Sequence, residues 1–206
     1  MSKKLDALRQ FLQRLDTPIA IGVSGGVDST FLLLQSLEVK GRGGVIPVFM
    51  DSEFVSQEDR HWIVKVSSQL GVHIESIQWE PLSYLEVRSN TRRRCYWCKL
   101  YMYMKLKKRM DGLAVHHILD GTQYDDLKKD RPGLNAIKKL NIMTPLADFF
   151  LTKEEIRCES NKYRLVTADR PSQACLATKI EFGSTLTKGR LLDAEARMAS
   201  HENRGR

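Results

Sequence analysis

The feature that most constrains the fold of this chain is an apolar run over residues 19–23 that leads directly into Ser24-Gly25-Gly26 and then into a second apolar segment. Two adjacent glycines let the backbone turn sharply, because they have no Cβ atom. The amides from about Gly25 to Ser29 can then point at an anion bound at the start of the following helix. The pattern therefore predicts a strand, a phosphate-binding turn and a helix, in that order.

Polar side chains in and after this turn can contribute to the same site. Ser24, Ser29 and Thr30 supply hydroxyl groups, and Asp28 is a candidate either for orienting a Mg²⁺ ion or for capping the following helix. The sequence has neither the lysine-bearing G-x-x-x-x-G-K-[ST] loop nor the dinucleotide-binding G-x-G-x-x-G pattern. An ordinary strand-turn-helix corner is the structural alternative to a phosphate site.

Apolar segments alternate along the chain in the way that is typical of a parallel sheet. Strands are expected at residues 45–50, 73–77 and 115–119, and a helical pattern covers residues 56–70. This alternation predicts an α/β fold, an open doubly wound parallel sheet with helices on both faces. Apolar residues at helical spacing over residues 5–15 predict an amphipathic helix ahead of the first strand.

Polar residues follow the predicted strands at the points where the strands end. Asp51 follows the second strand, and Asp120-Gly121-Thr122 follows the fourth. Ligands of open parallel sheets bind beyond the carboxyl ends of the strands. We therefore expect the Gly121 turn to lie close to the Gly25 turn, although the two are far apart in the sequence.

Composition indicates a cytoplasmic globular protein. The 206 residues are expected to form one principal domain over residues 1–193, followed by a flexible polar tail over residues 194–206. No segment reaches the roughly 18 apolar residues of a membrane span, and no secretion signal is recognisable. A net charge of +8 suits an anionic ligand and is also compatible with RNA, so charge alone does not choose between them.

Four cysteines in a reducing compartment indicate metal or redox chemistry rather than disulfides. Cys95 and Cys98 form a C-x-x-C motif just before an amphipathic helix, and Cys175 stands alone in a later segment. Three thiolates can hold an iron-sulfur cubane that leaves one iron open, whereas a structural zinc usually takes four ligands. A zinc site and plain core thiols remain alternatives, and Cys158 is expected to be a buried helix residue without a ligand role.

Six ordered motifs resemble those of the LarE-type ATP-dependent sulfur transferases, which belong to the PP-loop ATP pyrophosphatases. They are the glycine turn at Ser24, R-C-Y-W-C-K from Arg94, D-G-T from Asp120 with Asp125-Asp126, R-P-G-L from Arg131, T-P-L-A from Thr144 with L-T-K-E-E-I-R from Leu151, and A-C-L-A from Ala174. Any one motif would be weak, but six in order are specific. Members of the family usually continue beyond the matching region, which runs from about residue 18 to about residue 190, so the C-terminus here looks shortened.

The resemblance implies that ATP is cleaved to AMP and pyrophosphate, that a small-molecule carboxylate is adenylated, and that sulfur replaces its oxygen, as in maturation of a nickel pincer cofactor. The residues implied to bind ATP and Mg²⁺ are Ser24, Gly25, Gly26, Asp28, Ser29, Thr30, Asp51, Gly121, Thr122, Asp126 and Arg131. In this family the cysteine at the Cys175 position either gives up its own sulfur or joins the C-x-x-C pair in holding a 4Fe-4S cluster that carries sulfide. Because all three cysteines are present, the cluster with Cys95, Cys98 and Cys175 as ligands is expected, in preference to zinc.

Other functions fit parts of the same pattern. Iron-sulfur PP-loop enzymes also thiolate tRNA, and the basic clusters at residues 92–94 and 105–109 suit an RNA partner. A nucleotide-binding remnant without catalysis is a further alternative. Amide-forming PP-loop synthetases fit less well, since ammonia transfer gives the cysteines no use. A sulfide donor and further copies of the chain in a homo-oligomer are the other expected partners.

Overall fold

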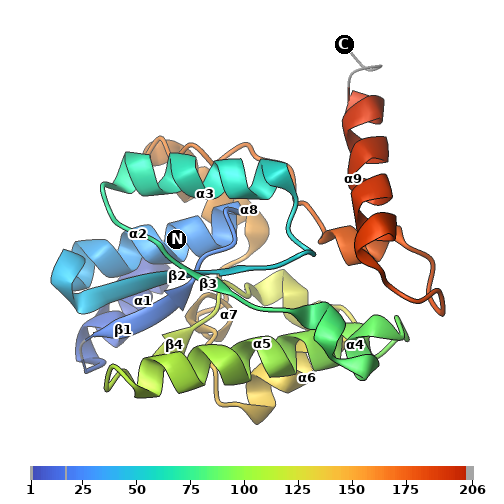
Figure 1. The fold of residues 1–206 in the computed structure, drawn as a ribbon. Helices are drawn as coiled ribbons and strands as arrows, with labels where there is room; N and C mark the ends of the chain where they lie inside the picture. Colours follow the sequence, from blue (N-terminus) through green and yellow to red (C-terminus); the bar gives the residue numbers. More distant parts are fainter. Residues whose placement is uncertain (1, 17, 203–206) are drawn as a thin grey trace.

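The computed structural model describes residues 2–16 and 18–202, and within them four parallel strands form one sheet in the order β3-β2-β1-β4. The strands are β1 (Ile19–Gly22), β2 (Val45–Asp51), β3 (Glu75–Gln78) and β4 (His117–Leu119). The chain moves outward from β1 to β3 and then returns to add β4 on the other side of β1 (Figure 1). The expected doubly wound parallel α/β sheet is therefore confirmed.

Helices cover both faces of this sheet (Figure 1). One face is covered by α1 (Ser2–Arg14), α2 (Val27–Lys40), α3 (Gln57–Leu70) and α8 (Lys153–Lys162), and the other by α5 (Arg94–Asp111) and α6 (Pro132–Lys139). The remaining elements are α4 (Leu85–Arg88), α7 (Pro145–Asp148), α9 (Lys188–Glu202) and the 3₁₀ turns η1 (Arg42–Gly44), η2 (Pro81–Ser83), η3 (Tyr124–Lys128) and η4 (Leu176–Lys179). None of the helices in the described part of the chain has the length and apolar character needed to cross a bilayer.

The central strand shows why the sheet needs helices on both sides. Ile19, Ala20 and Ile21 of β1 are all fully buried. Ile19 and Ile21 pack with the α1, α2 and α3 side, whereas Ala20 packs with the α5 and α6 side. A strand that is apolar on both faces is stable only between two layers of helices.

The loop after β2 ends in a capping box that sets the start of α3. The Oγ of Ser56 accepts a hydrogen bond from the Asp59 N–H at 3.1 Å, and the Asp59 carboxylate accepts one from the Ser56 N–H at 3.4 Å. Gly71 ends the helix with a φ of 60°, where a residue with a Cβ atom would be strained. The predicted helix over residues 56–70 therefore appears as α3, with Ser56 as its cap.

A third, smaller apolar cluster lies apart from the two faces of the sheet. Its buried members are Phe54, Val87, Leu176, Ala177, Leu186 and Leu191. They come from the loop after β2, α4, η4, the loop before α9 and the start of α9. The Leu176 N–H donates to the Phe54 carbonyl at 3.0 Å. We call these residues the third cluster.

The last helix stands away from the layered body of the molecule (Figure 1). The domain boundary expected at residue 194 falls inside this helix, α9, which continues to Glu202. Residues 203–206 of the expected tail lie outside the described residues.

Candidate active site

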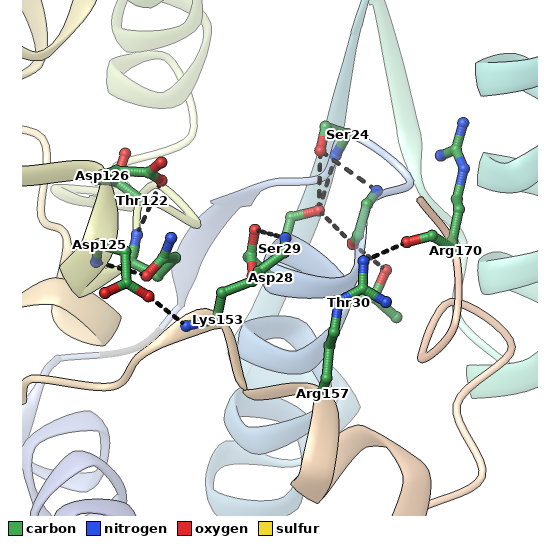
Figure 2. Close-up of polar contacts among 12 residues, drawn as sticks. Ser24, Asp28, Ser29, Thr30, Thr122, Asp125, Asp126, Lys153, Arg157 and Arg170 are labelled. Carbon is green, nitrogen blue, oxygen red and sulfur yellow. Dashed lines mark hydrogen bonds and ion pairs between the residues drawn. The ribbon is translucent and has the colours of Figure 1, made fainter. Parts of the chain in front are cut away.

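The turn after β1 is closed by its own hydroxyl groups (Figure 2). The Ser24 N–H donates to the Oγ of Ser29 at 3.1 Å, and the two Oγ atoms lie 3.1 Å apart. Gly25 has a φ of 74°, which L side chains rarely adopt. Ser24 is exposed, and the Gly26 N–H lies 3.4 Å from its Oγ. The turn can therefore present a hydroxyl and backbone amides to an anion.

Thr30, expected among the cofactor contacts, has its hydroxyl engaged inside the loop. The residue is fully buried, and its Oγ1 donates to the Gly26 carbonyl at 2.9 Å. The Oγ of Ser29 donates to the same carbonyl at 3.2 Å. These bonds fix the first turn of α2 and so stabilise the loop that precedes it.

The turn after β4 lies directly against this loop. A Cβ atom added to Gly121 would lie 2.9 Å from both the N and the Cα of Ser29, a separation that real Cβ atoms do not show. β1 and β4 flank the point where the strand order reverses, and open α/β sheets bind ligands in the crevice at that point. The expected approach of the Gly121 turn to the glycine loop is therefore confirmed at Ser29.

Asp120 is buried and holds the same turn in place through hydrogen bonds. Its carboxylate accepts hydrogen bonds from the Thr122 N–H at 2.7 Å and the Lys99 Nζ at 2.9 Å, and also from the hydroxyls of Thr122 and Tyr103. Burial raises the pKa of Asp120, but the charge of Lys99 and these hydrogen bonds outweigh it and lower the pKa to about 2. Lys99 directly follows Cys98, so this ion pair joins the cysteine-bearing helix to β4. Thr122, an expected cofactor contact, is turned toward Asp120.

Asp28 and Lys153 form an ion pair between α2 and α8, with 2.6 Å between Oδ2 and Nζ (Figure 2). The other carboxylate oxygen of Asp28 is buried and has no hydrogen-bond partner among the described residues. Burial raises the pKa of Asp28, Lys153 opposes this, and the charge of Asp126 raises the pKa further. An unpartnered carboxylate oxygen beside a second carboxylate suits a divalent cation that is otherwise held by substrate phosphates. The residues therefore fit the Mg²⁺ ion expected from the sequence.

The other expected cofactor residues are engaged with protein partners. Asp126 and Arg131 form an ion pair with each other. Asp51 accepts hydrogen bonds from the Arg60 Nε at 3.0 Å and the Gln78 Nε2 at 2.9 Å. Burial raises the pKa of Asp51, but the bonds from Gln78 and Arg60 hold it below its ordinary value. Asp51 thus ties β2 to β3 and α3 at the same edge of the sheet.

The three cysteines expected to act together lie near one another. Cys95 and Cys98 belong to the start of α5, and Cys175 directly precedes η4 and is exposed to solvent. Burial raises the pKa of Cys98, and the neighbouring Cys175 and Cys95 raise it further. Such mutual effects between thiols fall off with distance. Cys98 also packs against the third cluster, which contains Leu176 and Ala177, so the fold brings the C-x-x-C motif close to the segment that directly follows Cys175.

Arg94 connects the two cysteine-bearing segments. The residue is buried, and its Nη1 donates to the Ala177 carbonyl at 2.8 Å and to the Asn90 side chain. Its Nη2 lies 3.6 Å from the Sγ of Cys95. Protein atoms around the Cys175 thiol displace water from it and raise its pKa, although the residue is exposed at one side, and the Arg94 charge opposes that rise only in part. A guanidinium beside thiols favours the thiolate, which is the nucleophilic form.

Within residues 2–16 and 18–202, no three His, Cys, Asp or Glu side chains form a group that could hold a metal ion. The expected 4Fe-4S or zinc site therefore has no support in the arrangement of these thiols. The expectation that Cys158 is buried was wrong, because it is exposed on α8. Ile156 and Ser160, four residues apart, form the buried face of that helix, and Cys158 lies between them on the other side.

Three cations near the loop had no role assigned from sequence, namely Lys153, Arg157 and Arg170. Lys153 directly follows the N-cap residue Thr152 of α8, where the helix dipole disfavours a positive charge. That unfavourable placement is a local signal for a functional lysine. No comparable signal marks Arg170, which reaches the loop through the tertiary fold.

Comparison with known proteins gives a family for the chain. No family model matches it. The chain is 31% identical over 197 residues to the uncharacterized protein slr1717 of Synechocystis sp., a match that covers 93% of this chain and 70% of that protein. It is 28% identical over 171 residues to the pyridinium-3,5-bisthiocarboxylic acid mononucleotide synthase of Lactiplantibacillus plantarum, which covers 82% of this chain and 61% of the synthase.

A shorter match relates part of the chain to another enzyme. It is 33% identical over 109 residues to the NH(3)-dependent NAD(+) synthetase of Hyperthermus butylicus, covering 47% of this chain and 38% of the synthetase. Both named relatives support a PP-loop assignment, in agreement with the parallel sheet and the glycine loop at the end of β1. With 31% identity over more than nine-tenths of its length, the chain belongs to the same family as slr1717.

Proposed function

We propose that the protein is an ATP-dependent sulfur transferase that adenylates a small-molecule carboxylate and replaces one of its oxygens with sulfur. The observation that supports this proposal is the contact of the Gly121 turn with the glycine loop at Ser29, together with the bond from Lys99, next to the C-x-x-C motif, to Asp120 of that turn. The relative named as a bisthiocarboxylic acid synthase supports the proposal, since its name describes carboxyl groups that contain sulfur.

The first step is adenylation. The phosphates of ATP bind at the amides of Gly25 and Gly26 and at the hydroxyl of Ser24, with Lys153 nearby as a cation. A carboxylate oxygen of the acceptor attacks the α-phosphorus, and the bond to pyrophosphate breaks with its electrons leaving on pyrophosphate. Mg²⁺ held beside Asp28 and Asp126 would neutralise charge on that leaving group. The product is an acyl adenylate.

The second step forms the carbon–sulfur bond. The Cys175 thiolate attacks the activated carbonyl carbon, and the bond to AMP breaks with its electrons leaving on AMP. Loss of the Cα proton of Cys175 to a base, with cleavage of its Cβ–S bond, then releases a thiocarboxylate and leaves dehydroalanine. The exposure of Cys175 lets an acceptor reach it, and the charge of Arg94 offsets part of the rise in the pKa of this thiol.

Sulfide from an external donor, attacking the same carbonyl carbon, is the second route. No step is assigned to an iron-sulfur cluster, because the described cysteines do not form a group that could hold a metal. The proposed setting is the cytoplasm, where thiols stay reduced.

Acceptor-dependent release of pyrophosphate tests the adenylation. With Mg²⁺, ATP and pyridinium-3,5-dicarboxylate mononucleotide as the probe, AMP and pyrophosphate are expected in equal amounts, and only when the probe is present. The intact mass of the protein is expected to fall once, by the mass of H₂S, because each chain can give up the sulfur of Cys175 only one time. Nucleotide binding without pyrophosphate release on any carboxylate would overturn the proposal, and release stimulated by tRNA instead would support tRNA thiolation.

Metal analysis separates the sulfur sources. Anaerobically purified protein is expected to contain no stoichiometric iron or acid-labile sulfide if Cys175 supplies the sulfur. Stoichiometric iron and labile sulfide in the wild type, both lost in Cys95→Ala, would replace this route with the cluster route and leave the adenylation step intact.

A further inference from the structure

Arg170 contacts the phosphate loop from a position 145 residues later in the chain. Its side chain is only 2% exposed. The Nη1 atom donates to the Gly25 carbonyl at 2.7 Å, and the Nη2 atom donates to the Asp59 carboxylate at 2.5 Å. The guanidinium also lies 5.0 Å from the centroid of the Trp62 ring. Arg170 therefore joins the loop to the first turns of α3.

The bond to Gly25 fixes the direction of the next amide. In a trans peptide the carbonyl of one residue and the N–H of the following residue point in opposite directions. With the Gly25 carbonyl held on Arg170, the Gly26 N–H is turned toward the Oγ of Ser24, at the exposed mouth of the loop. Two adjacent glycines would otherwise leave this peptide free to rotate. Arg170 thus selects the orientation in which the amide can bind a phosphate oxygen.

Packing alone does not explain a charged residue at this place. A buried ion pair is usually no more stabilising than apolar side chains of similar volume. The Nε of Arg170 is, in addition, buried without a partner among the described residues, which costs further free energy. The guanidinium is, however, well suited to hold a carbonyl and a carboxylate at the same time.

The backbone of Arg170 is held as firmly as its side chain. Arg157 on α8 donates to the Arg170 carbonyl at 2.6 Å (Figure 2). It also donates to the Ala168 carbonyl at 2.6 Å. Cys175 follows Arg170 by five residues, so the two Cα atoms lie at most about 18 Å apart. Arg170 therefore also fixes the position of the backbone five residues before Cys175.

We propose that Arg170 is a positioning residue for the nucleotide: through the Gly25–Gly26 peptide it holds the loop in its phosphate-binding conformation. The inference rests on the proposed function, since it requires a pyrophosphate-bearing ligand. Asp59 is the other partner of the ion pair, but the hydrogen bond to the Gly25 carbonyl comes from Arg170. Asp59→Asn is therefore the matched control, because it removes the ion pair and keeps the bond to Gly25.

The test compares affinity for Mg²⁺–pyrophosphate, measured by calorimetry on the full chain. Arg170→Met is expected to bind at least about tenfold more weakly than the wild type, because a charged hydrogen bond to the loop is lost. Asp59→Asn, which keeps the Gly25 bond, is expected to stay within about twofold of the wild type. Arg170→Lys is expected to lie between Arg170→Met and Asp59→Asn, because a lysine ammonium cannot reproduce the guanidinium fork.

Thermal unfolding of each variant separates positioning from stability. Both Arg170→Met and Asp59→Asn lose the ion pair, and only the former is expected to lose affinity. A folded Arg170→Met variant that binds like the wild type, or no more weakly than Asp59→Asn, would overturn the inference. If Arg170→Met does not fold, Arg170→Lys takes its place in the comparison. An Arg170→Lys variant that binds Mg²⁺–pyrophosphate as tightly as Asp59→Asn, or more tightly, would contradict the inference. A wild type that binds neither pyrophosphate nor ATP would overturn the proposed function as well.

Discussion

The phosphate loop and the cysteine site lie in the same molecule but are built in different ways. The bonds that shape the loop join residues within one short motif, such as Ser24 with Ser29 and Gly26 with Thr30. The cysteine site depends on contacts such as Arg94 with Ala177, 83 residues apart, and on the third cluster behind it. Local bonds therefore close the loop, and Arg170 and the Gly121 turn then pack against it from later in the chain, whereas the cysteine site is formed only by distant segments.

This difference extends to stability. The loop lies between the main sheet and α2, both of which belong to the largest apolar cluster. The third cluster is the smallest of the three and includes the start of α9, which stands away from the body of the molecule. Regions with few buried apolar contacts open locally at lower free energy than the core does. The four predictions that follow test how separate the two regions are.

The largest effect is expected from Cys175→Ser. Sulfur transfer should fall by at least about a hundredfold, because serine has no sulfur to give to the activated carbonyl carbon. Pyrophosphate affinity should stay within about twofold of the wild type, since the loop is formed by other residues. Thiocarboxylate formation by mass spectrometry and pyrophosphate binding by calorimetry measure the two properties. If Cys175→Ser lost pyrophosphate affinity as well as sulfur transfer, the loop and the cysteine site would not be structurally independent.

Gly121→Ala tests the contact on the loop side. The added Cβ would lie 2.9 Å from the backbone of Ser29, so the variant should be destabilised by about 3 kcal/mol and should bind pyrophosphate more weakly. Gly43→Ala is the control, because nothing lies within 4 Å of its added Cβ. Urea unfolding gives the free energies. Equal stability of the two variants would contradict the close approach of the β4 turn to the loop.

Asp120→Asn tests the connection between the regions, since Asp120 binds Lys99 next to the C-x-x-C motif. Folding lowers the pKa of Asp120 from 3.8 to about 2, so the folded state binds the proton more weakly than the unfolded state. The stabilisation, about 2 kcal/mol, is complete above pH 4 and is lost as the pH falls toward 2. The free-energy difference between wild type and variant in urea should therefore shrink over that window. A difference that does not change with pH would contradict this role.

The smallest effect is expected from Cys158→Ser. Because Cys158 is exposed on α8, the substitution should change the free energy of unfolding by less than about 0.5 kcal/mol. Sulfur transfer should also be unchanged. Cys95→Ser is measured by the same two assays for contrast. If both variants lost sulfur transfer equally, Cys158 would have to be counted as part of the cysteine site.

Features that depend on local pattern could be predicted from the sequence. The glycine loop, the helix over residues 56–70 and the run of strands follow from glycine positions and apolar periodicity, and parallel topology then brings Gly121 to the loop. The strand predicted at residues 73–77 appears as β3 at Glu75–Gln78. Only alternate residues of this edge strand are partly buried, so its apolar pattern is weak and marks its ends poorly. Strand ends at a sheet edge carry the weakest apolar signal.

Features that depend on the path of the chain could not be predicted. No spacing rule indicates that Arg170 binds the Gly25 carbonyl or that Lys153 pairs with Asp28. The direction of a short side chain is also set by its surroundings, as the buried hydroxyl of Thr30 illustrates. The motif predicted which residue types gather at this edge of the sheet, and tertiary packing decided which of them remain open to a ligand.

The backbone contact between Gly121 and Ser29 has a consequence for how the molecule is made. Among the described strands β4 is the last to be synthesised, yet its turn packs against a loop that follows the first. A nascent chain that ends before residue 121 therefore lacks the turn that packs on Ser29, even when its early strands have paired. Pyrophosphate binding by released fragments of increasing length would thus show the chain length at which the four-stranded sheet is complete.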